Sequence, residues 1–149
     1  MNWSRSSVAA AAVTLAVILA ATSCGEQSAD AALAAALDRG SFVVTSSRGI
    51  ELPPASNLRI VFDDPDGASA TLGVSGGCNL IGGEIRFDDG VLISVDGWIQ
   101  TEMACDEPLM KLDTDTIALL DARPTVTLDG DRLVIDGGAT ALTLDRTTD

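Results

Sequence analysis

Short segments in which apolar and polar residues alternate, separated by turn dipeptides, dominate the chain from residue 41 to residue 146. A two-residue period is typical of strands that bury one face. Asp-Gly pairs stand between several of these segments, and both residues accept the positive φ of tight hairpins. The pattern predicts strands at 41–45, 58–62, 70–74, 84–87, 91–95, 125–128, 132–135 and 141–144.

One segment, from residue 106 to about residue 121, has a helical period instead. Asp106-Glu107-Pro108 combines a capping residue, an acidic first turn and an early proline. Five residues then recur on one face: Leu109, Leu112, Thr116, Leu119 and Leu120. We therefore expect a mainly β (α+β) domain, an antiparallel meander of about eight strands forming a barrel-like sheet, with one helix packed on it.

The first 23 residues have the pattern of a secretory signal peptide. Arg5 precedes a largely apolar stretch from Val8 to Ala21, and the chain turns polar directly after Cys24. A cysteine at this place is typical of a bacterial lipoprotein, in which the thiol is acylated and the residue becomes the new N-terminus. We expect Cys24 to carry a lipid that anchors the protein on the extracytoplasmic side of the cell membrane.

Two alternatives to a lipoprotein signal remain open. As a helix the apolar stretch would reach roughly 21 Å, less than the roughly 30 Å hydrocarbon core, which favours a cleaved leader over a membrane anchor. Ala21 stands where lipoprotein signals usually have Leu, so plain secretion after Ala20 or Ala21 remains possible. Residues 24–40, rich in alanine, are interpreted mainly as a flexible tether, with a short frayed helix as the alternative, and residues 41–146 are expected to form the domain.

Composition excludes several functions. The formal net charge of −13 repels phosphate backbones and anionic bilayers, so we expect no nucleic-acid partner and no docking on membranes by charge. The chain has no histidine, the commonest general base and metal ligand. The acidic turn 63–67 resembles a calcium loop, but Ser75 stands where that loop requires Glu. We expect no enzyme activity, metal or cofactor.

Cys78 and Cys105 are the two cysteines that remain beside Cys24. In an oxidising compartment an even pair is most simply a disulfide, which here would stabilise the fold by roughly 3 to 4 kcal/mol. The alternative is a reactive thiol at Cys78, although no histidine or lysine stands near it in sequence to lower its pKa.

Several of these residues occur in a recognisable order. Five segments carry the likeness: Gly77-Cys78-Asn79, Gly82-Gly83, Thr101-Glu102-Met103-Ala104-Cys105, Glu107-Pro108-Leu109-Met110 and Asp129-Gly130-Asp131-Arg132-Leu133. Together they resemble the META/HslJ domain family over about residues 41–146. The resemblance implies a mainly β meander with one helix, in envelope or secreted proteins that are often lipoproteins and are linked to stress tolerance. It implies no agreed biochemical activity.

Residues near this motif have two interpretations. Trp98 is either a core anchor or, if exposed, the first candidate for a contact surface. Thr101, Met103 and Ala104 are expected to pack beneath the helix, with Met103 as a core filler. This chain departs from its relatives at two positions. Phe42 replaces the usual opening Trp, and Ile81 stands where relatives often have an aromatic residue after the Gly-Cys-Asn segment.

Three functions follow as hypotheses. The first is a non-enzymatic, lipid-anchored envelope protein that acts in stress tolerance through contacts with an unknown envelope protein. The second is a carrier of a small apolar ligand, which requires a sizeable internal cavity. The third is an inhibitor of an extracellular hydrolase, with Trp98 or the Ser46–Ser56 segment as its contact.

Overall fold

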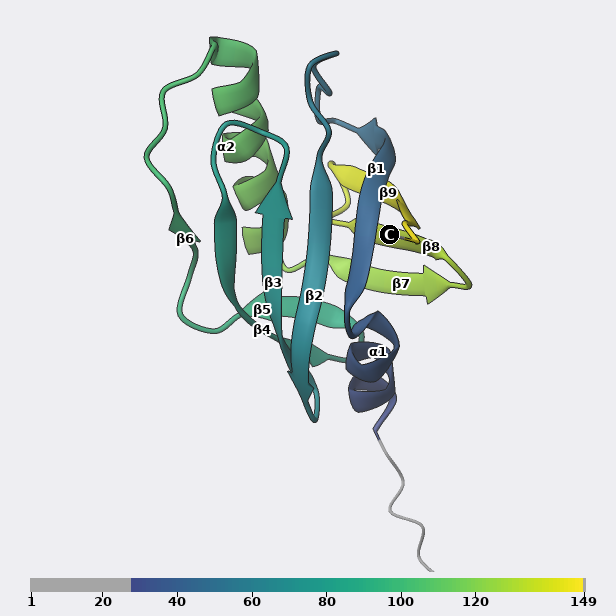
Figure 1. Cartoon of the computed structure of the whole chain (residues 1–149). Helices are drawn as coiled ribbons and strands as arrows, with labels where there is room; N and C mark the ends of the chain where they lie inside the picture. The colour runs from purple at the N-terminus through teal and green to yellow at the C-terminus, as the bar shows by residue number, and fades with distance from the viewer. Residues whose placement is uncertain (1–27, 149) are drawn as a thin grey trace, which may run out of the picture.

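The computed structural model describes residues 28–148, so the expected signal peptide and Cys24 lie outside the described residues. Two helices and nine strands make up this part of the chain (Figure 1). In order they are α1 (Ala29–Leu37), β1 (Gly40–Arg48), β2 (Arg59–Asp66), β3 (Ser69–Ser75), β4 (Ile81–Asp88), β5 (Val91–Ser94), β6 (Ile99–Gln100), α2 (Glu107–Asp121), β7 (Thr125–Asp129), β8 (Arg132–Asp136) and β9 (Ala141–Arg146).

Eight of the strands close into an antiparallel barrel. Their order is β3-β2-β1-β9-β8-β7-β5-β4, and the β3–β4 pairing joins the two ends. The ninth strand, β6, pairs with the first residues of β4, outside the ring. The expected barrel-like meander is therefore confirmed, with one short strand more than the alternation predicted.

The predicted turn chemistry explains the hairpins. Asp89 and Gly90 both have positive φ, 52° and 73°, in the two-residue connection of β4 to β5. In the β7–β8 hairpin, Val126 lies opposite Ile135 and Leu128 opposite Leu133, so the apolar residues share one face as expected.

Apolar side chains fill the interior of the barrel. Phe42 and Phe62 meet edge to face, with ring centroids 6.0 Å apart, and Arg146 lies over the Phe42 ring at 4.6 Å. Around them lie fully buried aliphatic residues from several strands, among them Ile60, Leu72, Ile85, Leu92, Leu133, Ile135, Leu142 and Leu144. The interior is therefore packed as a solid core.

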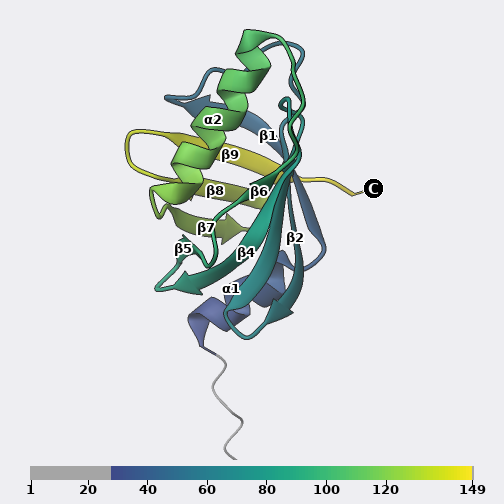
Figure 2. The ribbon, with the colours of Figure 1, turned by 90° about the vertical axis from the view of Figure 1, so that its left-hand side faces the viewer.

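Helix α2 covers the side of the barrel beside β7–β9 (Figure 2). The residues predicted on its inner face are largely buried, namely Leu112, Thr116, Leu119 and Leu120, while Leu109 is half-buried. Asp106 is the N-cap, although its side chain makes no capping hydrogen bond. Leu119 reaches the β8–β9 turn, where a Cβ on Gly137 would lie 2.8 Å from its Cδ1.

Helix α1 replaces part of the expected tether, so that expectation is wrong for residues 29–37. Ser28 caps the helix by accepting from the Ala31 N–H at 3.1 Å, and Ala31, Ala34 and Leu37 are buried against the barrel. These apolar residues recur every three positions and thus form an inner face. Alanine is so weakly apolar that the sequence pattern did not distinguish this face from a linker.

Helices of the described part are short. The longest, α2, has 15 residues, and none is long and apolar enough to cross a membrane.

Candidate functional site

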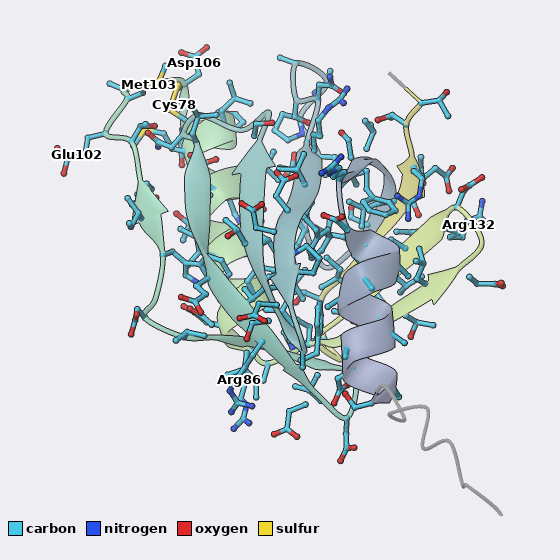
Figure 3. All side chains as sticks on the ribbon, turned by 60° about the horizontal axis from the view of Figure 1, so that its bottom comes forward. Cys78, Arg86, Glu102, Met103, Asp106 and Arg132 are labelled. Carbon is cyan, nitrogen blue, oxygen red and sulfur yellow. A yellow bond between two sulfur atoms is a disulfide. The ribbon has the colours of Figure 1, made fainter. Side chains whose placement is uncertain are left out.

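Three segments of the family motif, residues 77–79, 101–105 and 107–110, meet at one end of the molecule, where α2 begins, whereas Arg132 of the last segment lies on the other side (Figure 3). Figure 3 shows Cys78, Met103 and Asp106 gathered there, with Glu102 beside them and Arg86 at the other end of β4. The residue at the centre of this arrangement was not among the predicted site residues. It is Asp113 on α2, which is only 4% exposed.

The Asp113 carboxylate holds the turn before β4. Its Oδ1 accepts from the Cys78 backbone N–H at 3.1 Å, and its Oδ2 accepts from the backbone and side-chain N–H groups of Asn79 at 2.7 and 2.9 Å. A buried carboxylate needs such donors, because an unsatisfied charge in a core is strongly unfavourable. The turn and the helix are therefore fixed to each other.

Gly77 is required by this contact. A Cβ at residue 77 would lie 2.0 Å from Asp113 Oδ1, far inside van der Waals contact. The neighbouring Gly76 has φ +96° and passes so close to the Asn57 carbonyl that a Cβ there would also clash. Gly77 thus allows the turn to close over the carboxylate, and Gly76 allows it to pass the Asn57 carbonyl.

The Asn79 side chain joins the turn to the segment before α2. Its Oδ1 accepts from the Thr101 hydroxyl at 3.0 Å and from the Met103 backbone N–H at 2.8 Å. The Thr101 hydroxyl oxygen in turn accepts from the Leu80 N–H at 3.1 Å. Asn79 therefore uses both ends of its amide within the fold.

The Cys78–Cys105 disulfide closes the same arrangement, with Cα atoms 5.7 Å apart. This confirms the predicted bridge and leaves neither cysteine as a free thiol. We call Gly77, Cys78, Asn79, Thr101, Cys105 and Asp113 the motif clamp. Its polar groups are satisfied by one another, so its chemistry is structural.

Met103 does not fill the core, and the expected packing of residues 101–104 beneath the helix is wrong. The Met103 side chain is 57% exposed, and Thr101 and Ala104 are exposed as well. The physical reason is that this segment passes outside the barrel, held by hydrogen bonds of Asn79 and by Cys105, so that its side chains point into solvent.

Trp98 is half-buried and packs against the core. Its Nε1 donates to Asp121 Oδ1 at 2.8 Å, at the end of α2. A Cβ on Gly83 would lie 3.0 Å from the indole Cε3, so that glycine provides the space in which the ring lies. Of the two interpretations, the core anchor is favoured, while the next residue, Ile99, is exposed.

An apolar groove lies on the outer face of β3, β4 and β6. The two most exposed large apolar side chains of the described residues, Ile99 at 81% and Leu80 at 61%, stand beside it. The hollow has a volume of about 520 Å³ and is open to solvent. We call it the β6 groove, lined by Thr71, Leu80, Ile81, Gly82, Gly83, Glu84, Ile99, Gln100 and Thr101.

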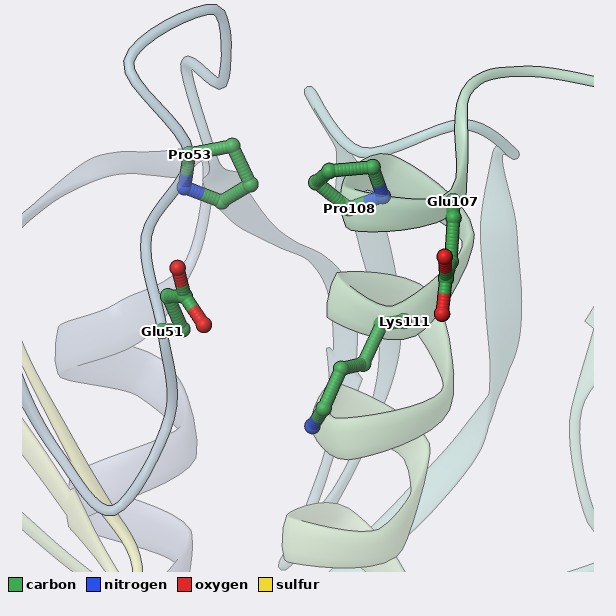
Figure 4. A pocket seen from close by; sticks show the side chains of 5 residues that line it. All are labelled: Glu51, Pro53, Glu107, Pro108 and Lys111. Carbon is green, nitrogen blue, oxygen red and sulfur yellow. The ribbon is translucent and has the colours of Figure 1, made fainter.

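A second hollow separates the loop after β1 from the start of α2. Figure 4 shows Pro53 and Pro108 on opposite walls, with Glu51, Glu107 and Lys111 below them. The hollow has a volume of about 170 Å³. The Lys111 ammonium pairs with Asp115, one turn further along α2.

No three His, Cys, Asp or Glu side chains in residues 28–148 stand close enough to hold a metal ion together.

The pKa of Asp136 is lowered, first by the Gly138 N–H and then by Arg48, each donating to its Oδ1 at 2.7 Å. This exposed pair orders the β8–β9 turn. Its small contribution to stability is present above the unfolded pKa of Asp136 and is lost as the pH falls through the lowered value.

Two features of the site lay beyond the sequence analysis. Asp113 could have been found from its place between Leu112 and Thr116 on the predicted buried face, where a charged residue requires partners. The β6 groove depends on Leu80 and Ile99, which stand far apart in sequence and gave no signal of being neighbours.

The fold and the motif clamp together define a small, mainly β barrel domain, and the comparisons place it in a family. The model of the META domain matches residues 35–149, which is most of the chain. The chain therefore belongs to the META domain family.

Two solved structures share the fold. One is an NMR structure of a protein 24% identical in sequence, with a TM-score of 0.62, covering 75% of this chain and 92% of that chain. The other is an NMR structure of a protein from Burkholderia xenovorans, also 24% identical, with a TM-score of 0.59, covering 79% of this chain and 88% of that chain. No curated protein matches this chain.

Proposed function

We propose that this chain is a lipid-anchored, non-enzymatic cell-envelope protein whose META domain acts through contact with another protein. The observation that carries the proposal is the exposed apolar surface of the β6 groove. Ile99 at 81% and Leu80 at 61% exposure stand on one face of a closed barrel. Large apolar side chains grouped in water are typical of interaction sites.

The filled interior argues against the alternative of an apolar ligand carrier. A carrier of this kind buries most of its ligand in an internal cavity. Here the barrel axis is occupied by Phe42, Phe62 and their aliphatic neighbours. The hollows described above lie instead at the surface.

The hydrolase-inhibitor alternative has less support. It called for an exposed aromatic residue or a protruding loop, but Trp98 is half-buried and bonded to Asp121. In the Ser46–Ser56 segment, Ile50 and Pro53 are buried, and Ser47 and Ser56 donate to the carbonyls of these two residues at 2.6 Å. This segment is bound to the body of the domain.

Site-specific photocrosslinking in living cells tests the proposed contact. A photoreactive amino acid is placed at Ile99, and in a matched variant at Met110, an exposed apolar residue of α2 outside the groove. We expect a discrete adduct of higher mass from position 99 and much less from position 110. Equal labelling at both positions, or no adduct at 99, contradicts the proposal.

Stress tolerance requires a separate test with the same surface. In a strain that lacks the gene, Leu80→Ser with Ile99→Ser should fail to restore survival under heat or envelope-directed antibiotics, while Met110→Ser should restore it. Both variants must accumulate as folded protein at the level of the unchanged chain. Full restoration by the double variant contradicts a role of this surface.

A further inference from the structure

The β6 groove has features that identify the chemistry of its occupant. We propose that it binds an extended polypeptide segment of a partner protein, which places an apolar side chain over Gly82 and a Lys or Arg side chain beside Glu84. This inference rests on the proposed function, because it names the kind of partner that the same surface accepts.

Strands β3, β4 and β6 form the floor of the groove, and their register shows which residues face outward. Gly82 lies opposite Ile99 on β6 and opposite Gly73 on β3, and Leu80 continues the same outward face of the chain. Leu72 and Val74 on β3, and Ile81 and Ile85 on β4, point into the core, so Gly73 and Gly82 both point outward. Gly82 thus leaves bare backbone beside Leu80 and Ile99, whereas at Gly73 a Cβ would lie 3.0 Å from Val61 Cγ2, so the Val61 side chain occupies the space over that residue.

The fold does not itself require glycine at residue 82. The nearest atom to a Cβ there is the Leu72 carbonyl oxygen at 3.7 Å, an ordinary contact, and φ is not positive. Gly83 and Gly77, by contrast, make room for Trp98 and Asp113. Since glycine weakens a strand interior, its presence at residue 82 is best explained by what lies above it.

The shape of the groove favours a macromolecule over a small ligand. It is open on its outer side, so a small apolar molecule would keep much of its surface in water, whereas binding pockets bury most of theirs. A polypeptide segment can insert one side chain over Gly82 and continue along the sheet in both directions.

The negative charge near the groove indicates which kind of macromolecule could bind there. Glu84 lines the groove and is exposed. Glu102 projects into solvent beside Met103, at the end of the molecule where α2 begins (Figure 3). Arg86, the next outward residue of β4, forms an ion pair with Asp88 at 3.4 Å. A second copy of this chain, with its own net charge of −13, and an anionic bilayer are both repelled. A cationic, apolar segment is attracted.

Selection from a random library tests this directly. A phage library of ten-residue peptides is selected on the purified, processed protein, with Gly82→Val as the counter-selection target. We expect the enriched peptides to carry a large apolar residue with Lys or Arg within two positions. Their affinity should fall at least about tenfold on Gly82→Val, which fills the space above the strand.

The enriched peptides then serve to test the role of the Glu84 charge and the place where the peptides bind. Glu84→Gln should weaken binding about two- to fivefold at low salt and remove most of its salt dependence, as expected for an exposed ion pair. Met110→Ser, outside the groove, should change nothing. Amide chemical shifts should move at β3, β4 and β6, and the unfolding midpoint of each variant must match that of the unchanged chain.

Several results overturn the inference. They are peptides that bind Gly82→Val equally well, enriched sequences with no excess of basic residues, dimerisation abolished by Gly82→Val, or selective binding to phosphatidylcholine vesicles through the groove. If the crosslink from Ile99 to an envelope protein persists while these peptides fail, the proposed function stands and only the chemistry of the occupant is wrong.

Discussion

At the scale of single residues, the motif is explained by one buried carboxylate. Asp113 accepts three hydrogen bonds from Cys78 and Asn79, and Gly77 is the residue type that allows the approach. Asn79 then carries the connection on to Thr101 and Met103. The motif residues therefore act as hydrogen-bond donors and acceptors that position α2 against the turn before β4.

We expect Asp113→Asn to destabilise the domain by about 2 to 3 kcal/mol, because the new amide N–H₂ group would face an N–H donor and leave it unsatisfied in the interior. Urea unfolding followed by Trp98 fluorescence measures the loss. Asp115→Asn is the matched control, since it is on the same helix and loses only its surface ion pair with Lys111, worth less than about 1 kcal/mol. Equal losses in the two variants would contradict the role of Asp113.

At the scale of elements, the sequence pattern predicted the structure well where burial alternates. The β7–β8 hairpin and α2 lie within a residue or two of their predicted limits, because Val126 and Leu133 alternate with polar neighbours and the Leu112 face has a clear helical period. Prediction failed where the signal was weak. The strand predicted at 84–87 begins at Ile81, so that Gly82 and Gly83 lie inside β4, and β6, which was not predicted, is only two residues long.

The disulfide allows a prediction about α2. Cys78–Cys105 closes the chain just before the helix, so reduction should lower the free energy of unfolding by about 3 kcal/mol. The Asp113 hydrogen bonds should still hold the middle of α2, and amide exchange should therefore rise first at its N-terminal turn. Native-state exchange with and without reductant measures this.

The control for reduction is the double variant Cys78→Ala with Cys105→Ala, whose exchange should not respond to reductant. If reduction accelerated exchange in β7–β9 as much as at the start of α2, the disulfide would stabilise the whole barrel evenly, and the local role given to it here would be wrong.

At the scale of the whole molecule, the family, barrel and disulfide were predictable, whereas the seating of α1 and the β6 groove were not. Ala31 and Ala34 become buried because the barrel provides a surface at its base. Ile99 and Leu80 become neighbours because β6 returns to the start of β4. Both depend on contacts between segments that lie apart in the chain, which a one-dimensional pattern does not contain.

The proposed anchor gives a prediction at this scale. Cys24→Ala should move the protein out of the membrane fraction or leave it unprocessed, because the acylated thiol would be the attachment. Fractionation followed by intact mass spectrometry of the extracted protein measures both outcomes. An unchanged distribution with an unlipidated N-terminus would mean that the protein is held in the envelope in another way.

The seating of α1 decides how such a protein would stand on a membrane. Asp30 accepts from the backbone N–H groups of Asp89 and Gly90 at 3.0 and 2.8 Å, so the helix is fixed to the base of the barrel. Four residues lead from Cys24 to the cap Ser28, a reach of about 14 Å at full extension. Figure 1 places the β3–β4 connection and the start of α2 at the far end from α1. If Cys24 is acylated, this short connection would hold the α1 end of the barrel near the membrane and leave the start of α2 at the opposite end, where a partner protein could reach it.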